Sequence, residues 1–195
     1  MYDIIYSPWR SPYFAITDDE CVFCNISEQI MIKNGSCKES IDNVVNQGLA
    51  NPDYSLEQQV RNMGKEKELH VFYNDSLCYA VMNLYPYTPG HFMLIPHTHV
   101  DSPSLLSQET WLHLSKLSQK AIAMLEEYGA DGINMGINIK QAAGAGIPKH
   151  LHVHFVPRFT GDTNFITAIG NTRVYGVEFA RIFDRMVELA KKYLC

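Results

Sequence analysis

The sequence has little of what marks several large classes of protein. Its 16 lysines and arginines are outnumbered by 21 aspartates and glutamates. An acidic chain without a basic run is a poor candidate for binding nucleic acid, because that binding depends on lysine and arginine neutralising phosphates. Long hydrophobic runs are also missing, since none approaches the roughly 20 apolar residues that cross a bilayer. We therefore expect neither a nucleic-acid nor a membrane partner.

Cysteine is scarce as well. The five cysteines are odd in number and do not fit a disulfide framework in a chain of 195 residues. Cys37, Cys78 and Cys195 have no evident partner. The opening MYDIIYSPWRSPYF lacks a basic stretch followed by an apolar core, so no secretory signal is expected. These observations predict a reducing compartment and a cytoplasmic location.

The order of hydrophobic patterns predicts an α+β fold. Apolar residues make up 46% of the chain, which is enough for a core and excludes disorder of the whole chain. We expect one long helix that ends near residue 128, an amphipathic C-terminal helix, and short strands before and between them. Such an order is typical of a mainly antiparallel sheet, here of about five strands. The expected strands cover residues 70–73, 77–82, 91–95, 132–139 and 150–156.

Residues 1–195 are expected to form a single domain that contains one irregular segment. Residues 28–68 are rich in Asn, Gln, Gly, Ser and Lys, and only residues 55–63 have a helical pattern. We interpret residues 28–68 as an insertion or flap.

Three alternating histidines are the sharpest feature of the chain. His150, His152 and His154 are separated by apolar residues that favour a strand. Residues i, i+2 and i+4 of a strand share one face, so the three imidazoles are expected together, neighbours about 6.6 Å apart. The apolar residues between them would then point into the core.

This cluster has four interpretations. The simplest is a set of structural histidines satisfied by hydrogen bonds, although three adjacent imidazoles would repel one another if protonated. The second is a three-histidine zinc site, as in hydratases and cupins. The third is chemistry on phosphorus, in which a neutral imidazole attacks and a neighbour assists. The fourth is a binding site with no turnover.

The same residues resemble a known family. The pattern over residues 150–156 is similar to the signature of the histidine triad (HIT) family of nucleotide hydrolases and transferases. Residues 21–26 resemble the opening of its zinc-containing bacterial members, and residues 83–96 resemble its ribose-binding strand and turn. Residues 9–13 and 161–165 resemble its bacterial diadenosine tetraphosphate phosphorylase-like branch.

The resemblance implies roles for particular residues. His152 would attack the α-phosphorus of an adenosine nucleotide or dinucleoside polyphosphate and form a covalent adenylyl-histidine. His154 would contact the phosphate or the leaving oxygen, Asn83 would bind the ribose, and Asn138 a phosphate oxygen. Four residues before the first triad histidine, the family usually has Gln or Ser, which holds the α-phosphate. This chain has Gly146 there, which can offer only its backbone N–H.

A second cluster suggests a metal site. Cys21 and Cys24 form a C-x-x-C pair that could supply two of the four ligands of a structural zinc, with a redox pair or idle thiols as alternatives. In the zinc-containing relatives, the other two ligands align with His99 and His150, and His97 is the spare candidate. With all four positions filled by the protein, the Zn²⁺ would be structural.

The resemblance implies a homodimeric enzyme that transfers a nucleotidyl group to water or to phosphate, that is, by hydrolysis or phosphorolysis. A rival interpretation is a nucleotide-binding regulatory or interaction module with little turnover, which Gly146 keeps open. A three-histidine zinc hydratase is a third interpretation, and it would leave Cys21 and Cys24 without a role.

Overall fold

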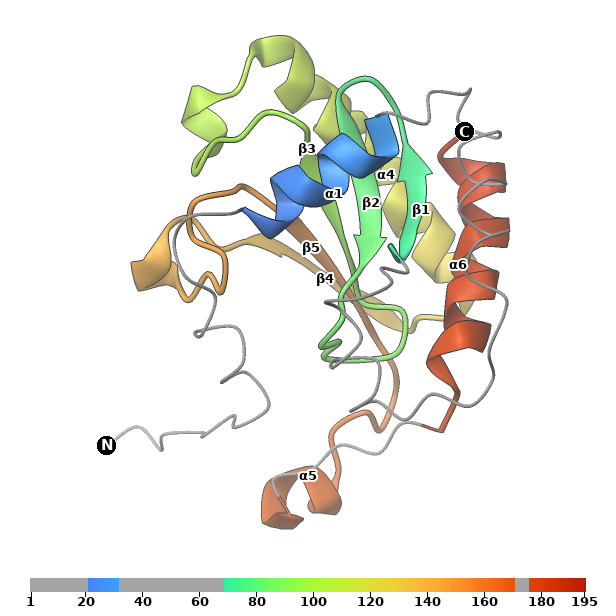
Figure 1. Ribbon diagram of the computed structural model, residues 1–195. Helices are drawn as coiled ribbons and strands as arrows, with labels where there is room; N and C mark the ends of the chain where they lie inside the picture. The colour runs from blue at the N-terminus through green and yellow to red at the C-terminus, as the bar shows by residue number, and fades with distance from the viewer. Residues whose placement is uncertain (1–20, 32–68, 171–175) are drawn as a thin grey trace.

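The computed structural model describes residues 21–31, 69–170 and 176–195. At its centre is a five-stranded antiparallel sheet in the order β1-β2-β3-β5-β4 (Figure 1). The strands are β1 (Val71–Asn74), β2 (Cys78–Met82), β3 (Phe92–Pro96), β4 (Gly132–Ile137) and β5 (Val153–Arg158). The helices are α1 (Val22–Met31), α4 (Gln108–Tyr128), α5 (Phe165–Gly170) and α6 (Phe179–Tyr193), with short 3₁₀ turns η2 (Pro103–Leu105) and η3 (Gln141–Ala143). The expected fold class is thereby confirmed.

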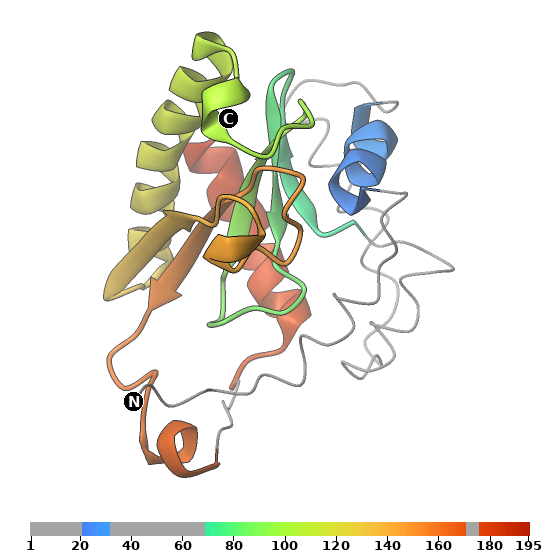
Figure 2. The same ribbon diagram turned by 90° about the vertical axis from the view of Figure 1, so that its left-hand side faces the viewer.

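Different helices cover the two faces of the sheet. Figure 2 shows α4 and α6 on one side of the strands and α1 on the other. Side chains alternate along a strand, so β2 serves two cores. Ala80 and Met82 pack with α4 and α6, whereas Tyr79 and Val81 pack with Phe23 of α1. This explains why all of β2 is buried although its side chains point both ways.

The long helix α4 has clear signals at both ends. Ser107 caps its start by accepting a hydrogen bond from the Thr110 amide at 3.1 Å. Gly129 ends it with a φ of 105°, a left-handed conformation that glycine adopts without a steric penalty. Pro103 lies in the separate 3₁₀ turn η2, and α4 begins at Gln108.

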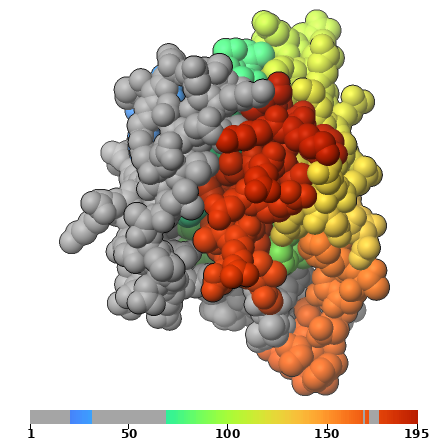
Figure 3. Space-filling model, turned by 90° about the vertical axis from the view of Figure 1, so that its right-hand side faces the viewer, coloured from blue at the N-terminus to red at the C-terminus, as the bar shows by residue number. Residues whose placement is uncertain are grey.

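The C-terminal helix α6 packs beside α4 on the same side of the sheet. Figure 3 shows its outer surface, in red, next to α4, in yellow. Ile182, Met186, Leu189 and Ala190 are buried at helical spacing, and the opposite face is polar. The amphipathic pattern of the sequence therefore predicts this helix correctly.

Helix α1, like the short helix α5, is an element that the sequence pattern missed. Phe23 and Ile30 are its two buried apolar side chains, two turns apart, which is a weak periodic signal. Since α1 extends to Met31, the predicted insertion at residues 28–68 overlaps a helix that packs on the sheet. Residues 32–68, with the helix expected at 55–63, lie outside the described residues.

Two further expectations concern the cysteines and the membrane. Cys21, Cys24 and Cys78 are free thiols, but Cys195 is disulfide-bonded, so the interpretation that Cys195 has no partner is wrong. Within the described ranges, no helix has both the length and the apolar character needed to cross a bilayer.

Candidate active site and metal centre

The triad histidines lie at the start of β5, on the α1 side of the sheet. Of the three, His154 is within the strand, and His150 and His152 occupy the segment just before it. The prediction of one strand over residues 150–156 is therefore wrong at its beginning. The Leu151 amide donates to the Val100 carbonyl at 2.6 Å, so the chain following β3 holds this segment outside the regular ladder.

His152 has the features of a nucleophile. Its Nδ1–H donates to the His150 carbonyl at 2.8 Å, which leaves the lone pair on Nε2. Burial lowers the pKa of His152, so the ring is neutral near pH 7. The ring centroid lies 5.3 Å from that of Phe23 and 4.8 Å from that of His154. A neutral imidazole is thus held in a defined orientation.

His154 is held in the complementary tautomer by His91, which no sequence motif singled out. The Tyr87 amide donates to His91 Nδ1 at 3.1 Å, so His91 carries its proton on Nε2. His91 Nε2–H in turn donates to His154 Nδ1 at 3.1 Å, which leaves the proton of neutral His154 on Nε2. His152 and His154 therefore offer one acceptor and one donor side by side.

His91 could have been found from strand register. Met93 pairs with His154, and His91 shares a face with Met93 because it lies two residues earlier. A histidine there is a diagonal neighbour of the triad. The side chain of His91 is completely buried, which also sets it apart from a surface histidine.

The predicted nucleotide-binding residues come from three separate parts of the chain. Asn83 is buried, its Oδ1 accepts from the Tyr85 amide at 3.0 Å, and its Nδ2 lies 3.4 Å from His91 Nδ1. Asn138 directly follows Ile137, the last residue of β4, which pairs with Val153. Gly146 lies in the loop before the triad, and a Cβ added to it would meet no atom within 4 Å.

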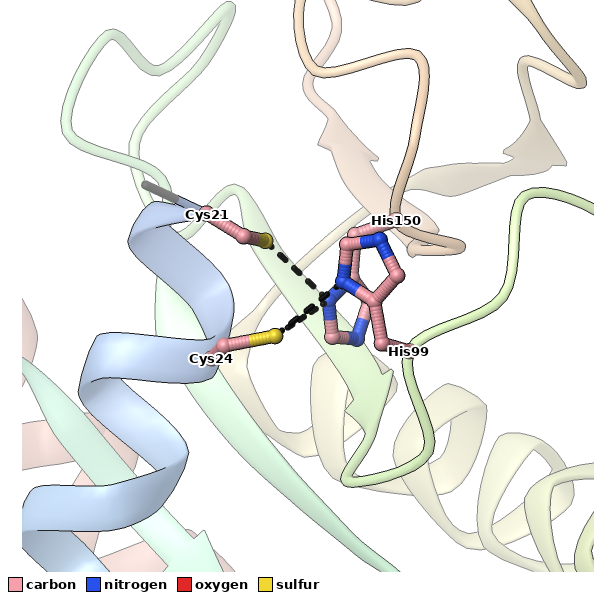
Figure 4. A group of neighbouring side chains, drawn as sticks. All are labelled: Cys21, Cys24, His99 and His150. Carbon is pink, nitrogen blue, oxygen red and sulfur yellow. Dashed lines mark hydrogen bonds between the residues drawn. The ribbon is translucent and has the colours of Figure 1, made fainter. Parts of the chain in front are cut away.

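The second cluster joins three separate parts of the chain, as Figure 4 shows. Cys21 and Cys24 come from the start of α1, His99 from the loop after β3, and His150 from the segment before β5. Cys21 Sγ lies 3.3 Å from His150 Nδ1, and Cys24 Sγ lies 3.6 Å from the same atom and 3.1 Å from His99 Nδ1. All four ligand atoms are within 4.8 Å of one another.

This donor set fits a tetrahedral zinc ion. Zinc bonds of about 2.3 Å to sulfur and 2.0 Å to nitrogen place ligand atoms about 3.5 Å apart. His150 Nε2–H donates to the Pro96 carbonyl at 2.9 Å, so the lone pair on Nδ1 faces the thiols. Burial lowers the pKa of His150 to about 4, which keeps it neutral. Burial and Cys21 raise the pKa of Cys24 to about 11, and a bound cation would oppose this by stabilising the thiolate.

His97, the spare ligand candidate, has a different role. Its Nδ1 accepts a hydrogen bond from Ser27 Oγ of α1 at 2.6 Å. Its Nε2–H donates to the Asp75 carbonyl at 2.9 Å. His97 therefore ties α1 to the turn between β1 and β2 and is not available to the metal.

A third group, Asp75, Cys78 and His113, also comes within metal-binding reach. The Asp75 carboxylate already accepts bonds from His113, from the Tyr73 hydroxyl, and from the amides of Leu77 and Cys78. Burial raises the pKa of Cys78, so its thiol stays protonated. We interpret this group as a satisfied hydrogen-bond network that anchors the β1–β2 turn to α4.

Comparison with known proteins gives the family. The HIT domain model matches residues 64–161, and the chain belongs to this family. It is 44% identical over 99 residues to the AP-4-A phosphorylase of Mycobacterium tuberculosis, a match covering 50% of this chain and 51% of that protein. It is 30% identical over 93 residues to the bis(5'-adenosyl)-triphosphatase of Dictyostelium discoideum, covering 47% and 62%. The matched region thus spans 51% and 62% of the length of these two relatives.

The fold is also found among solved structures. A Zn-bound histidine triad family protein from Mycobacterium smegmatis superposes with a TM-score of 0.54 at 24% identity, covering 68% of this chain and 91% of that one. At this identity the likeness establishes the shared fold. The expected family and fold are confirmed, and the four residues expected at the metal centre do converge.

Proposed function

We propose that the protein is a nucleotidyl hydrolase or transferase that acts on adenosine nucleotides or dinucleoside polyphosphates through a covalent adenylyl-histidine on His152. The observation that carries the proposal is the pair of opposite tautomers. His152 offers a lone pair on Nε2, and neighbouring His154 offers a proton on Nε2. Such a pair favours displacement at phosphorus, because one group attacks while the other donates a hydrogen bond to the leaving oxygen.

The reaction would proceed in two displacements. In the first, the Nε2 lone pair of His152 forms a bond to the α-phosphorus, and the bond from phosphorus to the leaving oxygen breaks. His154 Nε2–H donates a hydrogen bond to that oxygen, which departs as a phosphate anion while His154 stays neutral. In the second, an oxygen of phosphate, or of water as it releases a proton to solvent, forms the new P–O bond, and the P–N bond to His152 breaks. The His150 carbonyl stabilises the positive charge that His152 carries in between.

The relatives support the substrate class. Proteins named AP-4-A phosphorylase and bis(5'-adenosyl)-triphosphatase each share sequence with about half of this chain. In the proposed site, Asn83 binds the ribose, Asn138 a phosphate oxygen, and the Gly146 amide another. Water and phosphate are both possible acceptors at the second step, and the products distinguish them.

A structural zinc ion is the proposed cofactor. Cys21, Cys24, His99 and His150 would fill all four tetrahedral positions and leave none for substrate, so the metal would stabilise the site and take no part in bond making. The Zn-bound relative of the same fold supports the choice of metal.

A homodimer is the proposed assembly. β4 is an edge strand that pairs with β5 alone among the described strands, and an open edge can pair with a second copy. Met135 at the centre of β4 is 48% exposed, and Ile139 just beyond it is 42% exposed. Light scattering of purified protein would give twice the mass of the chain, and the mass of one chain would contradict the proposal.

The test of function is product analysis with diadenosine tetraphosphate, with and without inorganic phosphate. ADP plus ATP, formed only when phosphate is present, would mean phosphorolysis. AMP plus ATP would mean hydrolysis. If the nucleotide binds tightly but is not consumed over hours, the proposed activity is wrong. That result would favour a nucleotide-binding regulatory module, in agreement with the missing side chain at Gly146.

A further inference from the structure

One side chain contacts both the metal centre and the proposed nucleophile. Phe23 lies in the first turn of α1 between Cys21 and Cys24, and its ring is only 4% exposed. It meets the His150 ring edge-on, with centroids 5.5 Å apart and an angle of 83° between the planes. It also meets the His152 ring, with centroids 5.3 Å apart and an angle of 54°. Phe23 therefore fills the space where the two sites adjoin.

The two ends of α1 are held differently. Ser27, near the middle of the helix, is fixed by its bond to His97, and Ile30 packs in the core. The first turn is fixed by the Tyr79 hydroxyl, which donates to the Phe23 carbonyl at 2.9 Å, and by the two cysteines at the metal centre. The metal site therefore helps to hold the Phe23 ring in place.

The orientation of His152 depends on three neighbours. Its Nδ1–H bonds to the His150 carbonyl, and its ring lies against Phe23 and His154. His150 is itself a member of the metal centre, and Phe23 lies between two others. Two of the three contacts that orient the His152 ring therefore come from the metal cluster: one from His150 itself, and one from Phe23, which lies between Cys21 and Cys24 in the sequence.

We propose that Phe23 is a positioning residue that couples cation binding at Cys21, Cys24, His99 and His150 to the orientation of His152. With the cation bound, the first turn of α1 is rigid and Phe23 keeps the His152 ring in one orientation. Without the cation, that turn relies on weaker thiol–imidazole hydrogen bonds, and the ring loses a supporting surface. The coupling is reciprocal, so fixing His152 would also tighten cation binding. The effect on rate rests on the proposed function, but the orientation of His152 does not.

The experiment compares Phe23→Ala with Ile30→Ala, each with zinc and after treatment with a chelator. Ile30 is the matched control because it is buried on the same helix, in the same core, two turns from Phe23. Long-range ¹H–¹⁵N spectra of the His152 imidazole report its tautomer without any nucleotide. We expect one Nδ1–H tautomer in the zinc-bound wild type and in Ile30→Ala. We expect averaged tautomers in Phe23→Ala and in chelator-treated wild type.

Turnover provides the second readout. Phe23→Ala should keep its zinc and its KM but lose about 10- to 100-fold in kcat, because small displacements of a reacting group carry costs of that order. Chelation should lower the wild-type kcat by a similar factor and have little further effect on Phe23→Ala. If chelation lowers both to the same extent, or if Phe23→Ala behaves like Ile30→Ala, the coupling is wrong.

Two controls keep the result interpretable. If Phe23→Ala does not fold, Phe23→Leu replaces it, since leucine keeps the apolar burial but removes the aromatic contacts. If the wild type turns over no nucleotide but its His152 tautomer still depends on Phe23 and zinc, the proposed function fails while the positioning role stands. If the tautomer is the same in every sample, the positioning role fails whatever the enzyme does.

Discussion

The two faces of the sheet are stabilised by different kinds of contact. The face covered by α4 and α6 buries a continuous set of apolar side chains, among them Leu125, Phe155 and Met186, all fully buried. The face covered by α1 buries fewer apolar residues and carries the triad, the metal cluster and the hydrogen bonds of His97. One face is held by a large apolar core, and the other by a smaller apolar cluster together with polar contacts that also position reactive groups.

Stability and chemistry therefore depend on different faces of the sheet in this chain. Burial of apolar surface is non-directional, so the α4–α6 face gains free energy without fixing any one side chain. Hydrogen bonds and metal ligation are directional, so the α1 face can hold imidazoles in chosen tautomers. Substitutions on the two faces should therefore have separable effects on folding and on activity.

The largest effect is expected at the centre of the α1 face. His152→Asn should reduce turnover by about a thousandfold or more, because removal of a covalent nucleophile leaves only binding and charge stabilisation. Zinc content and the thermal unfolding curve should stay near those of the wild type. The measurement is kcat with diadenosine tetraphosphate, and a rate within tenfold of the wild type would show that His152 is not the nucleophile.

Loss of the metal should come next. Cys24→Ser should bind little zinc and lose about 4 kcal/mol of stability at zinc concentrations a thousandfold above the wild-type Kd. Cys78→Ala is the matched control, since its buried thiol lies on the α4–α6 side and should leave the metal in place. Metal analysis and denaturant unfolding test this pair. Full zinc content in Cys24→Ser would remove Cys24 from the proposed ligands.

A substitution on the α4–α6 face should have the opposite profile. Leu125→Ala should lower stability by about 3 kcal/mol, because it leaves a cavity in a completely buried part of the core. At a temperature where the variant is still folded, kcat and zinc content should be unchanged. If kcat fell in parallel with stability, the two faces would not be separable and the comparison would be wrong.

The smallest effect is a gain. Gly146→Ser should raise kcat by about three- to tenfold, in the range of the net gain from one added hydrogen bond. The new side chain meets open space, so stability should not change. Gly90→Ser is the contrasting control, because Gly90 has a φ of +87° and an added Cβ would lie 2.8 Å from Tyr128 Cε1. An unchanged rate in Gly146→Ser would mean that the Gly146 amide already meets the need.

The parts that sequence predicts well are those with local patterns. The helical periods of α4 and α6 and the alternating strands are visible in short windows, because each is set by neighbours within a few residues. The C-x-x-C pair is a local pattern too, whereas Asn83, Asn138 and the two histidine ligands came from resemblance to a family. The convergence of the four metal ligands depends on how distant segments pack, which single residues do not encode.

The parts that sequence missed depend on contacts between distant segments. His91 acquires its role because β3 and β5 are neighbours, and Phe23 because α1 lies across the start of β5. β5 begins later than predicted, and this also has a long-range cause, since His150 turns toward the cysteines and Pro96. In each case the deciding partner is many residues away.

The central claim is that His152 forms a covalent bond to phosphorus, and trapping that bond tests it most directly. The protein would be mixed with a slow adenylyl donor, quenched, digested and sequenced by mass spectrometry. Because the three triad histidines share one peptide, fragment ions must locate the added AMP. We expect AMP on His152 in the wild type and no adduct in His152→Asn. AMP on His150 or His154, or rapid turnover with no adduct at any time, would contradict it.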